Sequence, residues 1–140
     1  MNVVDSSGWL EYFAEGKNAD FFAPAIEDSE HLLVPVICIY EVFKRLIQQR
    51  GLSAAQTNIG DMHSGRILDM NESLALSAAQ ISVDLKLPMA DSLILATARL
   101  NHATLWTQDE HFKDLEGVRY AQKLGQGVRG GKGSDLLVCH

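Results

Sequence analysis

The chain has 140 residues, of which 46% are hydrophobic and 21% are charged, so it is expected to form one domain with an ordinary core. Eighteen acidic residues against 12 basic ones give a net charge of -6, which argues against a protein that coats nucleic acid through bulk positive charge. The two cysteines lack metal-type spacing, the start lacks a signal-peptide pattern, and no apolar run approaches the ~20 residues that span a membrane. These features predict a cytoplasmic protein with no membrane association.

Short apolar runs alternate with longer amphipathic segments in the first half of the chain. The predicted strands are residues 2–5, 32–34 and 66–70. The predicted helices are residues 7–15, 19–28, 36–49 and 53–64. Gly51 is expected to end the third of these helices, and the S-x-x-Q pattern that begins at Ser53 predicts a capping box for the fourth.

The same alternation continues in the second half. Helices are predicted over residues 72–86 and 88–101, and strands over residues 104–106 and 118–121. Pro88 is well placed to begin its helix, because its fixed φ suits the first turn. Thr107 and Glu110 form a second capping-box pattern, which predicts a short helix with Thr107 as the N-cap.

The regular pattern stops after residue 122. Five of the chain's 11 glycines lie between residues 125 and 133, and Lys123, Arg129 and Lys132 outnumber Asp135. We therefore expect a folded domain over residues 1–122 and a Gly-rich, basic extension of unknown role over residues 123–140.

Strands that are separated by helices predict an α/β fold, a three-layer α/β/α sandwich with a central parallel sheet. In such sheets, ligands bind beyond the carboxyl ends of the strands. Asp5 ends the first strand and Asp109 follows the strand that ends at Trp106, so both are expected at this edge.

Two further acids have unusual positions. Asp91 lies in the first turn of its helix, and Glu41 lies in a helical segment that is apolar nearly all round, which predicts burial. A buried, unpaired carboxylate is unfavourable unless its pKa shifts or a cation offsets the charge. Several converging carboxylates suit a hard divalent cation such as Mg²⁺ or Mn²⁺.

Each acid also has a purely structural explanation. Asp5 could cap the following helix, Glu41 could pair with Arg45 one turn later, and Asp91 and Asp109 could each offset a helix dipole. The metal-site interpretation depends on the four acids as a set, because the acids at the strand ends and the acid within the helix can share one cleft.

Two hydroxyl side chains accompany the acids. Thr107 could serve only as a helix cap, or its hydroxyl could orient Asp109. Ser7 could orient Asp5, or it could contact a phosphate at the N-terminus of the first helix.

Taken together, these residues resemble the PIN domain, and more narrowly the VapC-type toxins of bacterial type II toxin–antitoxin pairs. The resemblance rests on Asp5–Leu10 with the sequence DSSGWL, Glu41 within its apolar helix, Asp91 after Pro88, and Thr107–Phe112 with the sequence TQDEHF. It covers residues 1 to about 122 and does not extend to the Gly-rich extension.

The resemblance implies an Mg²⁺- or Mn²⁺-dependent ribonuclease in which Asp5, Glu41, Asp91 and Asp109 are the catalytic, metal-binding residues. It further implies a homodimer, a cognate VapB-type antitoxin that occupies the active-site groove, and RNA cleavage that leaves a 5′-phosphate and a 3′-hydroxyl. Four basic side chains are candidates for holding the RNA: Lys44, Arg45, Arg50 and Arg99.

Two other functions stay open at this point. A phosphorylated receiver-type signalling domain would use Asp69 as phosphoacceptor, with Thr107 and Lys123 beside it, but it leaves Glu41 and Asp91 unexplained. A PIN-like module that only binds partners would have no need for four clustered carboxylates.

Overall fold

The computed structural model describes residues 1–124, so most of the predicted extension lies outside the described residues. The strands are β1 (Asn2–Val4), β2 (Leu32–Pro35), β3 (Arg66–Leu68), β4 (Thr104–Thr107) and β5 (Val118–Tyr120). The α-helices are α1 (Ser6–Phe13), α2 (Ala19–Ile26), α3 (Val36–Arg50), α4 (Leu52–Met62), α5 (Glu72–Leu85) and α6 (Met89–Leu100). Two 3-10 turns, η1 (Ser29–His31) and η2 (Glu110–Phe112), complete the described part.

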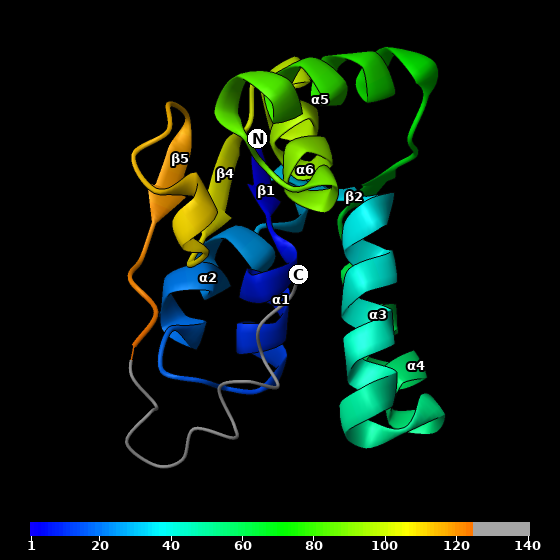
Figure 1. Cartoon of the computed structure of the whole chain (residues 1–140). Coiled ribbons are helices and arrows are strands. Elements are labelled where there is room, and N and C mark those ends of the chain that lie inside the picture. The colour runs from blue at the N-terminus through cyan, green and yellow to red at the C-terminus, as the bar shows by residue number, and fades with distance from the viewer. Residues whose placement is uncertain (125–140) are drawn as a thin grey trace.

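All five strands are parallel and form one sheet in the order β3-β2-β1-β4-β5, as the alternation of strands and helices predicts. The chain builds outward from β1 through β2 to β3, and then returns to the other side of β1 to add β4 and β5 (Figure 1). The strand order therefore reverses between β1 and β4, where Val4 pairs with Trp106. Such a switch point opens a crevice at the carboxyl ends of the two strands.

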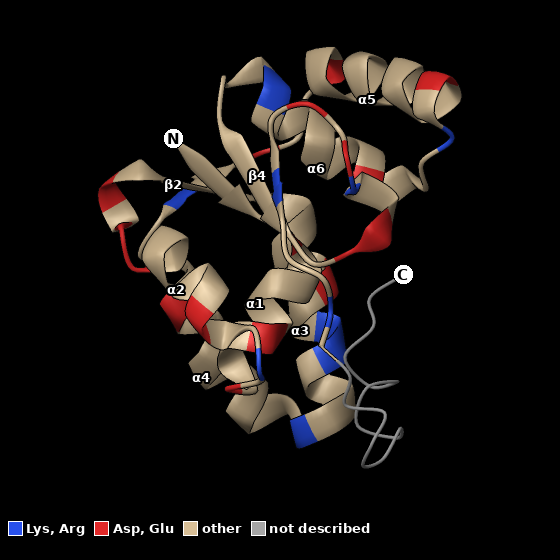
Figure 2. Cartoon of the chain, turned by 90° about the vertical axis from the view of Figure 1, so that its left-hand side faces the viewer, with Lys and Arg blue, Asp and Glu red and all other residues tan. Residues whose placement is uncertain are grey.

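Helices cover both faces of the sheet. Because connections between parallel strands are right-handed, α1 to α4, which connect β1, β2 and β3, lie on one face of the sheet. Helices α5 and α6, which connect β3 to β4, lie on the other face. Figure 2 shows this separation, with α5 and α6 on one side of the strands and α1 and α2 on the other. The predicted three-layer α/β/α sandwich is confirmed.

A continuous apolar core holds the layers together, and Trp9, Phe22 and Phe112 are among its fully buried side chains. Burial of each such ring contributes about 2–3 kcal/mol. Gly8 is necessary at the start of α1, because a Cβ there would lie 2.6 Å from the ring of Phe22 and 2.7 Å from Val4. Helix α2 can therefore pack closely against the residues that follow β1.

The link between α3 and α4 differs from its prediction. Gly51, with φ of +88°, ends α3 and is also the N-cap of α4. Ser53 lies inside α4, and no side-chain hydrogen bond caps this helix, so the predicted capping box is wrong. A glycine that turns the chain at positive φ leaves no room for a separate cap.

Helix α3 is also less enclosed than its composition predicts. Its buried positions are Cys38, Val42 and Leu46, which follow one stripe, while Tyr40 is 60% exposed and Glu41 is half-buried. The expected burial of Glu41 is therefore wrong in degree. In the described part of the chain, no helix is long and apolar enough to cross a bilayer.

Candidate metal centre

Asp5 and Thr107 meet at the switch point of the sheet. Asp5 directly follows β1 and Thr107 ends β4, and these two strands are paired neighbours. The Thr107 hydroxyl donates a 2.5 Å hydrogen bond to Oδ2 of Asp5, although the two residues are 102 positions apart in the chain. The topology therefore brings together the two strand ends that the sequence predicts.

Asp5 is only 2% exposed, and three residues donate hydrogen bonds to it. Besides Thr107, the Ser7 hydroxyl donates at 2.9 and 3.1 Å, and the Gly8 N–H donates at 2.8 Å. Asp5 is therefore the N-cap of α1, and Ser7 orients its carboxylate, as the sequence predicts for each residue. Burial nevertheless raises the pKa of Asp5 from 3.8 to about 7; these hydrogen bonds oppose the rise, and the charge of Asp109 adds to it.

Thr107 is not the helix cap that its sequence pattern predicts. Its hydroxyl accepts a hydrogen bond from the Asp109 N–H at 2.9 Å while donating to Asp5. The cap of η2 is Asp109, whose Oδ1 accepts from the His111 N–H at 2.9 Å. The Thr107 hydroxyl can serve both contacts at once, because it has one proton to donate and two lone pairs that accept. Thr107 consequently links two of the four acids.

Glu41 enters the cluster from α3. The Ser6 hydroxyl donates a 2.6 Å hydrogen bond to Oε1 of Glu41, and Ser6 is the chain neighbour of Asp5. The first two residues of α1 therefore hold two acids from different elements: Ser7 contacts Asp5, and Ser6 contacts Glu41.

Asp91, in the first turn of α6, faces the β4–η2 loop. Nδ1 of His111 lies 2.8 Å from Oδ2 of Asp91 and 3.3 Å from Oδ1 of Asp109. The pKa of Asp91 is raised from 3.8 to about 6, mainly by burial and also by the charges of Asp109 and Glu41, while the contact with His111 opposes the rise. His111 was not predicted from the sequence; its only signal is its place two residues after Asp109.

We call the four predicted acids the acidic cluster: Asp5, Glu41, Asp91 and Asp109. Ligand atoms of Asp91 and Asp109 lie within 4.8 Å of each other and of His111. Asp5 is linked to Asp109 through Thr107, and the charge of Glu41 acts on Asp91. Within residues 1–124, no lysine or arginine forms an ion pair with Asp5, Asp91 or Asp109. The donor set is carboxylate oxygen with one imidazole nitrogen, and its charges repel one another. This chemistry fits a divalent cation, which would offset the repulsion.

A second buried polar cluster, which was not predicted from the sequence, lies beside the loop that carries Asp109. Glu11 is 3% exposed and accepts hydrogen bonds from the Asn18 N–H at 2.8 Å and from the Gln108 amide at 3.4 Å. The Asn18 amide in turn donates to Gln108 at 2.9 Å and to the carbonyl of Gln122 at 3.1 Å. This Glu11 network, made of Glu11, Asn18 and Gln108, anchors the residue between Thr107 and Asp109.

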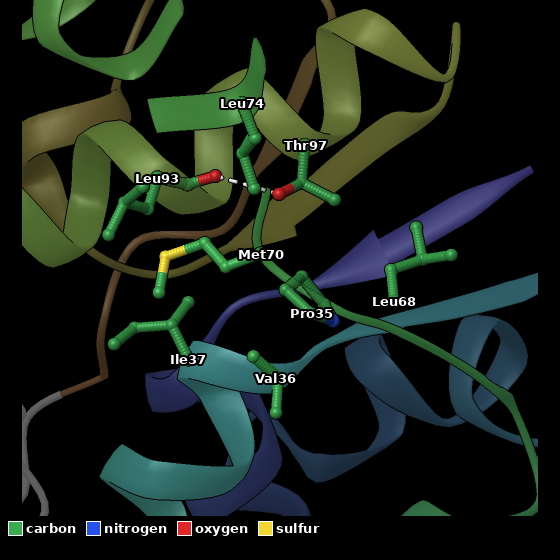
Figure 3. A pocket seen from close by; sticks show the side chains of 8 residues that line it. All are labelled: Pro35, Val36, Ile37, Leu68, Met70, Leu74, Leu93 and Thr97. Atoms are coloured by element: carbon green, nitrogen blue, oxygen red, sulfur yellow. Dashed lines mark hydrogen bonds between the residues drawn. The ribbon is translucent and has the colours of Figure 1, made fainter. Parts of the chain in front are cut away.

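A small cavity near the ends of β2 and β3 lacks the character of a ligand site (Figure 3). Its volume is about 10 Å³, and apolar side chains such as Ile37, Met70 and Leu93 line it. The one hydroxyl in its lining belongs to Thr97, which donates to the carbonyl of Leu93 at 2.8 Å. The cavity therefore offers no free polar group to a substrate.

Asp69 and Thr107, which a receiver-type site would need side by side, lie at separate strands of the sheet. Asp69 is exposed and follows the edge strand β3, whereas Thr107 ends β4. Strands β2 and β1 lie between them, which separates the strand ends by about 14 Å at ~4.8 Å per strand. The receiver-type alternative is wrong.

The fold and site together define an α/β/α sandwich with an acidic cluster at the switch point of a parallel sheet. The family model of the PIN domain matches residues 3–118, and the chain belongs to this family. No curated protein matches the sequence.

Solved structures share the fold at low sequence identity. A toxin–antitoxin complex from Klebsiella pneumoniae matches with a TM-score of 0.71 at 20% identity, over 85% of this chain and 96% of that one. VapBC2 from Rickettsia felis, bound to a DNA fragment from its promoter, gives a TM-score of 0.68 at 12% identity, over 86% and 97% of the two chains. The sarcin-ricin loop cleaving toxin VapC20 of Mycobacterium tuberculosis gives 0.64 at 15% identity, over 80% and 92%.

Proposed function

We propose that this protein is a divalent-metal-dependent endoribonuclease that acts as the VapC-type toxin of a toxin–antitoxin pair. The observation that carries the proposal is the convergence of the acidic cluster at the switch point of a PIN fold. The similar structures support it, since they include a toxin–antitoxin complex, VapBC2 and a sarcin-ricin loop cleaving toxin.

Asp5, Glu41, Asp91 and Asp109 would hold one or two Mg²⁺ or Mn²⁺ ions. A bound ion would supply a water of lowered pKa and would neutralise charge on the scissile phosphate. Ser7 and Thr107 keep the Asp5 carboxylate in a fixed orientation, and Ser6 does the same for Glu41. With three donors aimed at it, Asp5 need not reorganise when it binds an ion.

The RNA backbone would run from the acidic cluster along α3. Lys44 and Arg45 follow Glu41 by about one turn on this helix, and Figure 2 shows the basic positions of α3 in blue. Arg50 lies at the far end of the same helix, and Arg99 lies in the last turn of α6, away from the turn that carries Asp91. Lys44 and Arg45 are therefore the stronger candidates for phosphate contacts.

An antitoxin of the VapB type would cover the site. Beside Lys44 on α3, a shallow apolar hollow of about 360 Å³ is lined by Ile39, Tyr40, Phe43 and Ile47. This hollow adjoins the helix that carries Glu41, so an apolar segment of the antitoxin could fill it while blocking the acidic cluster. Inhibition by the protein encoded next to this one, and its loss on Phe43→Asp, would test this partner.

A homodimer is also part of the proposal. Leu76 and Val83 on α5 are 65% and 77% exposed, and Met89 at the start of α6 is 72% exposed. Apolar side chains this exposed are typical of a surface that a partner covers. A Val83→Glu variant that stays dimeric in light scattering would rule out this face.

We further propose that residues 1–122 are the nuclease domain and that the enzyme works in the cytoplasm, where RNA is available to it. No function is assigned to residues 123–140.

The central test is RNA cleavage by the full chain with Mg²⁺ or Mn²⁺. We expect Asp5→Asn to lose activity, and EDTA to abolish it in the wild type. Asp84→Asn is the matched control, because Asp84 is an exposed acid on α5. Equal cleavage by wild type and Asp5→Asn would contradict the proposal, and specific RNA binding without cleavage would favour the binding-module alternative.

A further inference from the structure

His111 adds an imidazole to a site whose other groups are carboxylates. Its Nδ1 lies 2.8 Å from Asp91 Oδ2 and 3.3 Å from Asp109 Oδ1, and one ligand atom from each of the three residues lies within 4.8 Å of the others. The three residues come from two parts of the fold: Asp91 from α6, and Asp109 and His111 from η2 and its N-cap.

The distances from His111 Nδ1 to the two carboxylate oxygens, 2.8 and 3.3 Å, are close to those between neighbouring ligands of one ion. In an octahedral site with bonds of about 2.1 Å, neighbouring ligands lie about 3.0 Å apart and opposite ligands about 4.2 Å apart. The imidazole nitrogen and the two carboxylate oxygens could therefore bind one ion, which would replace the proton that Nδ1 shares with the carboxylates.

The backbone holds His111 in this place. Its N–H donates to Asp109 Oδ1 at 2.9 Å, and the next residue, Phe112, is fully buried in the core. The His111 side chain itself is 44% exposed, whereas those of Asp91 and Asp109 are 13% and 18% exposed. The imidazole thus covers the solvent side of a pair of less exposed carboxylates.

A histidine next to a carboxylate is not in itself a metal site, as a second histidine–carboxylate pair, His31 with Asp28, illustrates. His31 Nδ1 lies 3.0 Å from Asp28 Oδ1, but these residues are three apart, both about half exposed, and the pair is outside the acidic cluster. His111 differs because it contacts two acids from separate elements, both of which belong to the cluster.

We propose that His111 supplies a nitrogen ligand to the ion held by Asp91 and Asp109, and that this nitrogen makes the site favour Mn²⁺ over Mg²⁺. Mg²⁺ binds oxygen and retains its waters, whereas imidazole suits transition metals, and affinity at a nitrogen-containing site rises along the first-row series. The inference rests on the proposed metal-dependent function and deepens it, since it names the chemistry that selects the ion.

The test is Mn²⁺ binding to the full chain without RNA, followed by electron paramagnetic resonance. We expect the pulsed spectrum of the wild type to show coupling from a directly bound ¹⁴N, and His111→Ala to lose it. The variant should bind Mn²⁺ about tenfold more weakly, while Mg²⁺, measured by competition, should change much less. His31→Ala is the matched control, because it removes the other histidine–carboxylate pair, and it should leave both measurements unchanged.

Two outcomes separate this inference from the proposed function. If Asp91→Asn abolishes Mn²⁺ binding but the wild type shows no nitrogen coupling, the metal site stands and the role of His111 is overturned. If the wild type binds no Mn²⁺, or Asp91→Asn binds it as the wild type does, both the inference and the metal site fail.

Discussion

Asp5, the N-cap of α1, and Glu11, within the same helix, show two ways in which this protein accommodates a buried carboxylate. Asp5 and Glu11 are both nearly inaccessible, at 2% and 3% exposure, and both accept several hydrogen bonds. Glu11 accepts hydrogen bonds from amide groups of Asn18 and Gln108, and these contacts stabilise the local fold. Asp5 lies near the carboxylate of Asp109, whose charge opposes its own.

The difference lies in the neighbours rather than in the depth of burial. A buried acid among amide donors is satisfied within the protein, whereas a buried acid among other acids is satisfied fully only when a cation joins them. The comparison therefore separates a carboxylate that maintains the fold from one that the fold places for a ligand.

The largest expected effect is on catalysis by Asp5. Asp5→Asn should reduce RNA cleavage at least about a hundredfold, since changing even the groups that orient a metal ligand costs 10- to 100-fold. Its unfolding free energy in metal-free buffer should stay within ~1 kcal/mol of the wild type, because asparagine is also a good N-cap. Cleavage assays and urea unfolding of the same preparations measure both.

A large effect is also expected from Glu11→Ala, but on stability. The change leaves the Asn18 N–H and the Gln108 amide without an acceptor in a buried place, which should lower the unfolding free energy by about 2–4 kcal/mol. Urea unfolding in EDTA measures this loss, with the exposed Glu30→Ala as control. A Glu11→Ala variant as stable as the wild type would remove the contrast with Asp5.

The pH dependence of stability should carry the signature of the acidic cluster. Asp5 and Asp91 have folded-state pKa values of about 7 and about 6, above their ordinary value of 3.8. Between pH 4 and 7 the folded protein therefore binds more protons than the unfolded chain, so metal-free stability should fall as pH rises through this range. The stabilisation that protonated Asp5 and Asp91 contribute to the folded state is fully present below pH 4.

Thermal unfolding at several pH values in EDTA tests this dependence. Added Mn²⁺ should flatten the profile by replacing protons with an ion, and Asp5→Asn should remove part of the slope. Metal-free stability that rises between pH 4 and 7 would show that repulsion among the acids does not dominate.

The smallest effect is expected from Thr107→Val. This change removes the hydroxyl that donates to Asp5 and accepts from the Asp109 N–H, while keeping a β-branched side chain suited to a strand end. We expect about a tenfold loss of Mn²⁺ affinity, measured by titration calorimetry. Thr57→Val, on the exposed side of α4, is the matched control and should bind like the wild type.

The features that could be predicted from the sequence were those that depend on residues close together in the chain. Alternating apolar runs located every strand to within two residues, and the strand ends were enough to predict where Asp5 and Asp109 meet. The capping patterns at Ser53 and Thr107 failed because a neighbouring residue is the N-cap in each case: Gly51 for α4 and Asp109 for η2. At Thr107 a partner 102 residues away uses the same hydroxyl.

The residues that were missed depend on tertiary contacts in the same way. Glu11 has the sequence context of an ordinary surface position in a short helix, and only the packing of Gln108 against it reveals its burial. His111 stands next to an apolar residue in a turn, and only the approach of α6 brings Asp91 to it. Neither contact has a periodic pattern that could be recognised in the chain.

The position of β4 has a consequence for the protein during its synthesis. The acidic cluster needs residue 5 from the start of the described chain and residues 107–111 from near its end, joined by the pairing of β1 with β4 in the middle of the sheet. An incomplete chain on the ribosome that ends before β4 lacks two of the groups that act on Asp5, namely Thr107 and Asp109. If the proposed toxicity resides in this cluster, a growing polypeptide is harmless until its final strands emerge, and premature termination before β4 yields an inert product.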